Sequence, residues 1–131
     1  MKAQIIVNKI LQKVICTSYG KGKKHDYRLF KESKVHIHPD IKVVVDSGYQ
    51  GIKKIHINSE VPKKRRKKNP LTKEDKKNNR ELSKTRVLVE NIIALIKRFK
   101  IVSDKYRNRR KRFCLRFNLI SAICNIENSM N

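Results

Sequence analysis

Cysteines, acidic side chains and long apolar runs are all scarce in this sequence. Its three cysteines, Cys16, Cys114 and Cys124, show no C-x-x-C spacing. That excludes a disulfide framework and a zinc ribbon, and it predicts buried free thiols in a reducing cytoplasm. No apolar run approaches the roughly 18 residues of a membrane-spanning helix, and the apolar stretch after Met1 is too short for a signal peptide.

Basic side chains outnumber acidic ones about threefold. The 131 residues include 34 Lys+Arg and 11 Asp+Glu, a formal net charge of +23. Such an excess costs self-repulsion in the folded state, but it suits a polyanion, because each phosphate that a cation neutralises releases counterions. The length fits one ordinary domain. We therefore expect one basic domain that binds nucleic acid, with an anionic membrane surface as the weaker alternative.

The start of the sequence predicts a hairpin and a helix. Residues 3–9 and 13–19 are rich in β-branched side chains and are separated by three residues, which predicts an antiparallel pair of strands. A basic glycine-containing loop follows. Residues 25–32 then predict a short helix with Asp26 at or near its N-cap.

Two further strands are expected before the middle of the chain. Residues 41–45, I-K-V-V-V, form a compact apolar run that is typical of a buried central strand. The alternation over residues 55–61 predicts another strand, which Pro62 ends.

Residues 61–71 predict a basic loop. It contains six consecutive cations, Lys63 to Lys68, between two prolines, and such a run is normally solvated. Thr72 with the acids that follow it then offers a helix cap.

Residues 72–131 predict a helical part. A polar helix is expected to about Ser83, a strongly periodic one over 84–100, and a final one over 109–127. The two expected core stripes are Leu88, Ile92, Leu95 and Phe99, and Phe113, Phe117, Ile120 and Cys124. The order β-β-α-β-(β)-α-α-α predicts an α/β fold with a mixed sheet that ends in helices.

Asp46 is the first candidate for chemistry. It follows the predicted central strand and precedes Ser47 and Gly48, and functional groups gather at the carboxyl ends of strands in open α/β sheets. An ordinary Asx-turn explains the same residue without any function. Tyr49, beside the turn, is interpreted as a packing residue rather than as a platform for a base.

Glu90 is the second candidate, in the middle of the helix predicted over 84–100. At about 100° per residue it lies away from the stripe of Leu88 and Ile92 and has apolar neighbours. The simple alternative is a pair with Arg86 at i,i+4, which is worth only tenths of a kcal/mol with the base first. An acid in a largely apolar helix more often has a partner or a task.

Carboxylates of this kind allow a metal-dependent reaction on nucleic acid. Two Mg²⁺ ions held by acids can align a water or a 3′-hydroxyl against a phosphodiester and stabilise the leaving oxygen. About three acids are usually needed for this chemistry, and spacing alone does not identify such a site.

Three segments together resemble one family. They are K-K-H-D-Y-R-L-F (23–30), V-V-V-D-S-G-Y-Q-G-I (43–52) and R-V-L-V-E-N-I-I-A-L-I-K-R-F-K (86–100). In this order they resemble the DDE superfamily endonuclease type of insertion-sequence transposase, which is related to the Harbinger transposases. The resemblance covers residues 3–125, and D-S-G-Y-Q-G and R-x-x-V-E-N are specific when they occur together.

The resemblance implies a fold and a site. The fold is a ribonuclease H-like core with divalent Mg²⁺ or Mn²⁺ as cofactor and DNA as substrate. Asp46 takes the place of the second metal-binding acid and Glu90 that of the third. His25 and Asp26 match a family pair to which we assign no role, and Asp26 is not counted as a catalytic acid.

The resemblance also implies that one catalytic acid is missing. In the family the first catalytic Asp lies on an earlier strand, whereas no acid precedes Asp26 here. Residues 1–131 are therefore expected to be the C-terminal part of a catalytic domain that lacks its first strand. Because such acids act as a unit, we expect weak metal binding and impaired or absent cleavage.

DNA binding is expected to remain without cleavage. Plain solvation of a Lys-rich surface is the alternative explanation for the basic runs at 63–68 and 105–112. The cations expected to contact DNA are Lys63, Lys64, Arg65, Arg66, Lys67, Lys68, Arg86, Lys97, Arg109 and Arg110.

Two other hypotheses stay open. A non-catalytic basic nucleic-acid-binding module would keep Asp46 and Glu90 apart or paired with Arg86 and Lys97, whereas a metal site would bring the two acids together. Alternatively, the chain associates with itself or with full-length transposase and inhibits it. In each case the expected place is the cytoplasm, at the nucleoid if the chain is bound to DNA.

Overall fold

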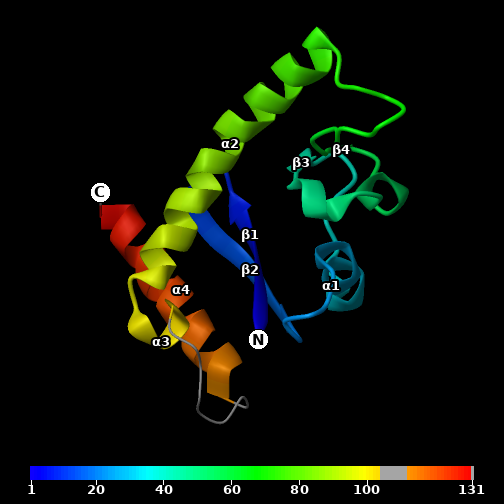
Figure 1. The fold of residues 1–131 in the computed structure, drawn as a ribbon. Helices are drawn as coiled ribbons and strands as arrows, with labels where there is room; N and C mark the ends of the chain where they lie inside the picture. Colours follow the sequence, from blue (N-terminus) through cyan, green and yellow to red (C-terminus); the bar gives the residue numbers. More distant parts are fainter. Residues whose placement is uncertain (104–111, 131) are drawn as a thin grey trace. The chain divides into compact units, whose positions relative to one another are not determined.

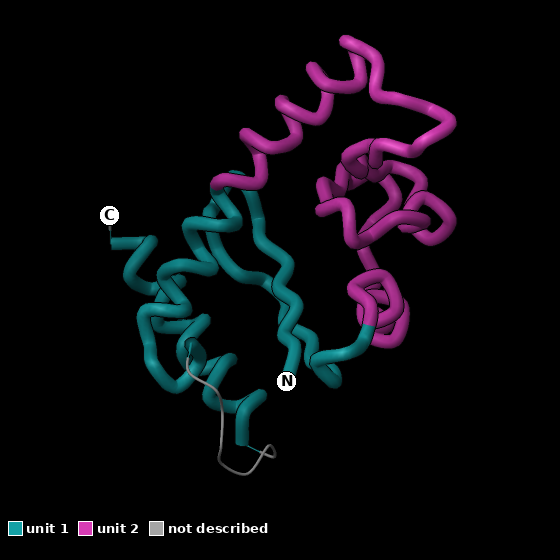
Figure 2. The backbone as a smooth tube through the Cα atoms, viewed as in Figure 1, with its two compact units in different colours: residues 1–24, 88–131 teal, residues 25–87 magenta. Residues whose placement is uncertain are grey.

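The computed structural model describes residues 1–103 and 112–130 (Figure 1). The chain divides into two compact units, which Figure 2 distinguishes by colour. The first, called here the hairpin unit, comprises residues 1–24 and 88–131, and the second, called the insert unit, comprises residues 25–87.

The hairpin unit begins with the predicted antiparallel hairpin. Strand β1 (Lys2–Asn8) pairs with β2 (Lys13–Gly20). The register shifts inside the pair: Ile6 faces Cys16, whereas Val7 faces Val14. Ile15 is therefore an extra residue on β2, which makes a β-bulge.

Helices complete the hairpin unit. The two predicted helical segments form one continuous helix, α2 (Lys73–Lys97), of which the part from Leu88 lies in this unit; α3 (Lys100–Ser103) and α4 (Phe113–Met130) follow. On α2 the fully buried residues are Ile92 and Ile96, so the predicted stripe missed Ile96. The predicted α4 stripe is confirmed, and the buried core consists of Val14, Ile92, Ile96, Phe113, Phe117, Ile120 and Cys124.

The insert unit combines short elements. They are α1 (Asp26–Ser33), β3 (Val43–Val44), two 3₁₀ turns, η1 (Ser47–Tyr49) and η2 (Ile52–Lys54), β4 (Ser59–Glu60) and the first turns of α2. Leu29, Phe30 and Ile52 are buried. His56 is buried too, with Nε2 2.6 Å from the carbonyl oxygen of Ile41, so a buried polar ring is satisfied by the backbone.

The prediction of a buried central strand over residues 41–45 is wrong. Only β3 forms, its two residues are half-buried, and Ile41 is 54% exposed. In the described part of the chain β3 pairs only with β4, in parallel. An apolar run becomes a central strand only when neighbouring strands flank it, and β3 has a neighbour on one side.

The strand predicted over residues 55–61 is confirmed only at β4. The chain continues from η2 into a turn, in which the His56 amide donates to the Ile52 carbonyl at 2.8 Å. His56 is buried while Ile57 is 89% exposed. The alternating pattern would bury the isoleucine and expose the histidine, but the structure does the opposite.

The α/β class is confirmed for the described residues. They form two two-stranded sheets, one antiparallel and one parallel, rather than a single mixed sheet. Within this part of the chain no helix has the length and apolarity to cross a membrane. The three cysteines are free as predicted, but only Cys124 is fully buried.

Candidate functional site

Asp46 sits directly after β3 and caps the 3₁₀ turn η1. Its backbone is extended, its carboxylate accepts from the Ser47 amide at 2.5 Å, and its carbonyl accepts from the Tyr49 amide at 3.0 Å. The carboxylate thus bonds the amide of the next residue, whereas an Asx-turn would bond the amide two residues on. The carboxylate is fixed by its own turn and is still 52% exposed, so it remains available to a partner.

That carboxylate holds a cation in the structure. Nη1 of Arg86, on α2, lies 3.3 Å from Oδ1 of Asp46. At this degree of exposure the pair contributes up to about 1 kcal/mol to stability. Sequence reasoning expected Arg86 to pair with Glu90 or to contact DNA. Only the alternative of a non-catalytic module included a pairing of Asp46 and Glu90 with Arg86 and Lys97.

Asp26 belongs to the same turn. A Cβ added at Gly48 would lie 2.5 Å from Oδ2 of Asp26, so the carboxylate fills the space that the glycine leaves open. Sequence reasoning gave Asp26 no role. The one available signal was the glycine of D-S-G-Y, which permits such a close approach.

Tyr49 lies between these carboxylates and the core. Its ring meets that of Phe30 edge to face at 6.5 Å, so it packs as expected. Burial first, and then the charges of Asp26 and Asp46, together raise the pKa of Tyr49 to about 12. We call Asp46 to Tyr49, with Asp26 against them, the acidic turn.

Glu90 lies on α2, four residues and thus about one helical turn after Arg86. It is exposed and belongs to the hairpin unit, whereas Asp46 belongs to the insert unit. An ion shared by the two acids therefore stays a prediction. Among the described residues no group of three His, Cys, Asp or Glu side chains is arranged to hold a metal ion.

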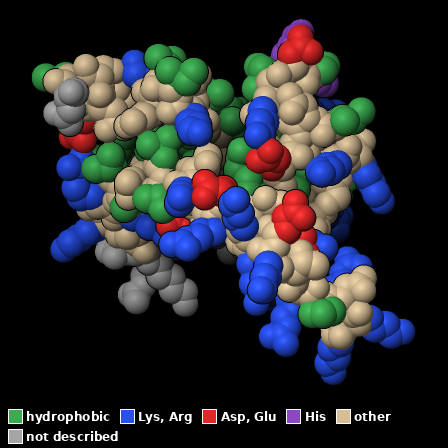
Figure 3. All heavy atoms as spheres, turned by 90° about the horizontal axis from the view of Figure 1, so that it is seen from above, with side chains coloured by type: hydrophobic (Ala, Val, Ile, Leu, Met, Phe, Trp, Pro, Cys, Tyr) green, Lys and Arg blue, Asp and Glu red, His purple; other side chains and the backbone are tan. Residues whose placement is uncertain are grey.

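The basic run Lys63 to Lys68 lies between β4 and α2, exposed and without helix or strand, as predicted. Lys97, at the end of α2, is exposed as well. Arg109 and Arg110 lie outside the described residues. In Figure 3 Lys and Arg side chains project over much of the visible face, with few acids among them.

Comparisons with known proteins agree with one another. The family described as "DDE superfamily endonuclease" matches residues 1–126. A protein of Microchaete diplosiphon described as "Probable transposase for insertion sequence element IS702" is 47% identical over 127 residues, which are 97% of this chain and 46% of that protein. The chain thus spans about half the length of this relative. No solved structure matches the chain.

Proposed function

The chain belongs to the DDE superfamily endonucleases, and from that premise we propose that residues 1–131 form part of the catalytic domain of an insertion-sequence transposase. The proposed substrate is DNA, and the proposed reaction is metal-dependent cleavage of a phosphodiester followed by strand transfer. The proposed core is ribonuclease H-like. The similarity to a probable transposase over 97% of the chain supports this proposal.

Asp46 and Glu90 are the proposed metal ligands. The observation that carries this proposal is the Asp46 carboxylate, which its own turn fixes and which is still half exposed. Carboxylate oxygens are the hard ligands that Mg²⁺ and Mn²⁺ prefer. A bound divalent ion would polarise a phosphate oxygen and favour attack by water or a hydroxyl.

The residues around Asp46 have proposed supporting parts. Arg86 neutralises Asp46 until a metal takes its place, and it lies one turn before Glu90 on the same helix. Asp26 and Gly48 hold the turn in shape by close packing.

Cleavage by residues 1–131 alone is proposed to be weak or absent. They supply two of the three acids that the resemblance implies, and catalytic groups that act together lose most of their effect when one is removed. We propose weak binding of Mg²⁺ or Mn²⁺ for the same reason. DNA binding through the exposed cations, self-association, association with a full-length transposase, and a place at the nucleoid in the cytoplasm are parts of the same proposal.

A non-catalytic nucleic-acid-binding module is the second candidate. The ion pair between Arg86 and Asp46 favours it, because a carboxylate that is already neutralised needs no metal.

A metal-binding and nicking experiment separates the two candidates. Mn²⁺ binding is measured by calorimetry, and nicking of supercoiled DNA is measured with Mg²⁺ or Mn²⁺. The variants are Asp46→Asn and Glu90→Gln, and the matched control is Asp40→Asn, an acid whose side chain is 91% exposed beside His38. We expect weak Mn²⁺ binding that both variants lose and the control keeps, with little nicking throughout.

Two other results would each contradict one part of the proposal, either the metal site or the impaired cleavage. Mn²⁺ binding that neither variant reduces would remove the metal site and leave the nucleic-acid-binding module. Efficient nicking that either variant abolishes would refute the proposed impairment and support the ligands.

A further inference from the structure

The basic run does not extend freely from the fold, because its first residue is clamped to α2. The amide of Lys63 donates to Oδ1 of Asn79 at 2.9 Å, and Nδ2 of Asn79 donates back to the Lys63 carbonyl at 3.0 Å. The Lys63 ammonium also meets Oδ2 of Asp75 at 2.8 Å. These three bonds fix the position of Lys63, the first residue of the basic run. Its charge is paired with Asp75 within the protein.

The Asp75 end of this clamp is built into the helix cap. The Thr72 amide donates to Oδ2 of Asp75, and the Asp75 amide donates to the Thr72 hydroxyl, both at 3.1 Å. This is a capping box with Asp in place of Glu. The hydrogen bond from Lys63, and then that from Thr72, lower the pKa of Asp75, so the clamp persists at neutral pH.

The middle of the run is folded as a tight turn. The Arg66 amide donates to the Asn69 carbonyl at 3.3 Å, and the Asn69 amide donates to the Arg66 carbonyl at 3.2 Å. Reciprocal bonds of this kind close the backbone between the two residues. A solvated, purely repulsive run of cations would have no reason to close on itself.

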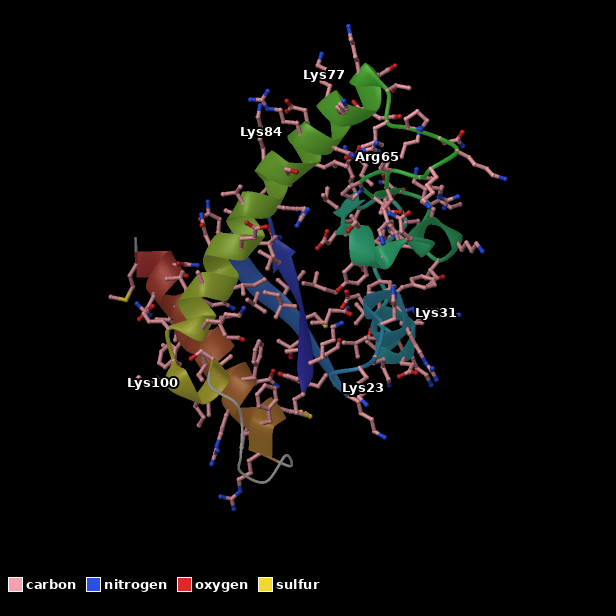
Figure 4. The ribbon with its side chains drawn as sticks, in the orientation of Figure 1. Lys23, Lys31, Arg65, Lys77, Lys84 and Lys100 are labelled. Carbon is pink, nitrogen blue, oxygen red and sulfur yellow. The ribbon has the colours of Figure 1, made fainter. Side chains whose placement is uncertain are left out.

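Three basic residues line an open hollow beside this turn. Arg65, Arg66 and Lys67, together with Pro70, line an open hollow of about 410 Å³. Figure 4 labels Arg65 on the segment between β4 and α2. In the described parts of the chain no acid pairs with any of these three side chains, whereas Lys63 has Asp75 and Lys42 has Glu60 at 2.6 Å.

We propose that Arg65, Arg66 and Lys67 form a phosphate-binding pocket that takes the backbone of DNA, and that Asn79 and Asp75 are its positioning residues. This rests on the proposed function, since it names how a DNA-acting chain grips its substrate. Guanidinium forks match two phosphate oxygens at once, and the ammonium adds a point charge. A clamped and closed loop loses less conformational freedom on binding than a free one.

A charge-matched pair of variants tests the pocket. The affinity of the full chain for a short fluorescein-labelled DNA duplex is measured by anisotropy over a series of KCl concentrations. Arg65→Ala/Arg66→Ala should weaken binding about tenfold or more and flatten the slope of log Kd against log [KCl] by about two. Lys76→Ala/Lys77→Ala removes the same charge from exposed positions of α2 and should have a clearly smaller effect on both.

A neutral variant tests the clamp without altering the charge. Asn79→Ala removes both bonds to the Lys63 backbone, whereas Asn78→Ala removes an exposed neighbour of the same type on the same helix. Asn79→Ala should weaken DNA binding severalfold and Asn78→Ala should leave it unchanged. Circular dichroism of both variants controls for loss of the fold.

The outcomes distinguish the pocket from the proposed function. If the unaltered chain fails to bind the duplex, the DNA-acting function itself fails. If it binds but the two double variants weaken binding equally, net charge alone explains binding and the pocket is refuted. Inorganic phosphate that displaces the duplex far better than KCl of equal ionic strength would make the pocket a site for free phosphate, which overturns its assignment to the DNA backbone.

Discussion

At the scale of single residues, the acidic turn joins chemistry to packing. Asp46 keeps an exposed carboxylate because its turn satisfies one oxygen and Arg86 approaches it from α2. Tyr49, directly after, is held neutral by burial and by the two nearby acids. The turn thus exposes the Asp46 carboxylate on one side, and on the other side the Tyr49 ring packs against Phe30.

Removing the charge of Asp26 should lower the pKa of Tyr49. In Asp26→Asn we expect that pKa to fall from about 12 but to stay above the ordinary 10.0, because burial is the larger cause. NMR of tyrosine labelled at Cζ, followed through an alkaline titration, measures it. Asp40→Asn is the control and should leave the pKa unchanged; an unchanged value in Asp26→Asn would contradict the placement of Asp26 at the turn.

The same shift has a consequence for stability. Since the folded pKa of Tyr49 exceeds the unfolded one, its contribution is present below pH 10 and is lost as the pH rises toward about 12. The alkaline loss of stability should therefore be shallower in Asp26→Asn than in the unaltered chain.

The sequence identified part of this turn in advance. Asp46 could be singled out because it follows an apolar run, a signal that lies within a few neighbouring residues. Asp26 and Arg86 lie 20 and 40 positions away from it along the chain. Their approach depends on tertiary packing, for which a single sequence carries no local pattern.

At the scale of elements, α4 is fastened to the hairpin through the β-bulge. Val14 precedes the extra residue Ile15 on the edge strand β2, and its amide and carbonyl face α4. The Val14 amide donates to Oδ1 of Asn125 at 2.8 Å, and Nδ2 of Asn125 donates to the Val14 carbonyl at 2.9 Å. One side chain on α4 therefore bonds both backbone groups of Val14, the residue beside the bulge.

Asn125→Ala should be the most costly polar truncation on α4. It leaves an amide and a carbonyl without partners in a half-buried place, a loss of about 1–3 kcal/mol in the free energy of unfolding. Asn128→Ala, which removes one exposed bond to the Gln12 carbonyl at 3.1 Å, should cost less than about 1 kcal/mol. Urea denaturation measures both losses. Equal losses would contradict the proposed importance of the two hydrogen bonds between Asn125 and Val14.

Elements with strong local signals were predicted well, and those defined by neighbours were not. The hairpin and α4 follow from β-branched residues and from a stripe at helical spacing, both of which act within the segment itself. The strand expected over 41–45 failed because pairing with β4 covers only Val43 and Val44. The bulge at Ile15 was not predicted either, and Asn125, which bonds the neighbouring Val14, lies 111 residues beyond Val14 in the chain.

At the scale of the whole molecule, the net charge of +23 should act against folding. The ion pairs between side chains are mostly exposed, and each such pair contributes about 1 kcal/mol or less. In the described part of the chain, Lys and Arg pairs in which both partners are more than 40% exposed include Arg28–Glu32, Lys42–Glu60, Lys84–Glu81 and Arg98–Glu127. Attraction of this size is set against repulsion among 34 cations, so repulsion should dominate the response to salt.

Added KCl should therefore raise the melting temperature of the free protein. The Debye length falls from about 10 Å at 0.1 M to about 3 Å at 1 M, so most of the gain should come by a few tenths molar and then level off. Each kcal/mol regained corresponds to about 4 °C. Thermal unfolding followed by circular dichroism measures this, and Lys76→Ala/Lys77→Ala should start higher and gain less.

The same salt should weaken DNA binding, because it removes the counterion-release term that drives association. Added KCl should thus raise the melting temperature and lower the affinity for DNA. Both effects have one cause, because screening weakens the repulsion within the protein and also the attraction to the phosphates. A melting temperature that falls with KCl would mean that ion pairs outweigh repulsion. In that case the excess of cations would destabilise the fold little. Binding to a polyanion would then no longer be needed to explain why the sequence carries so many cations.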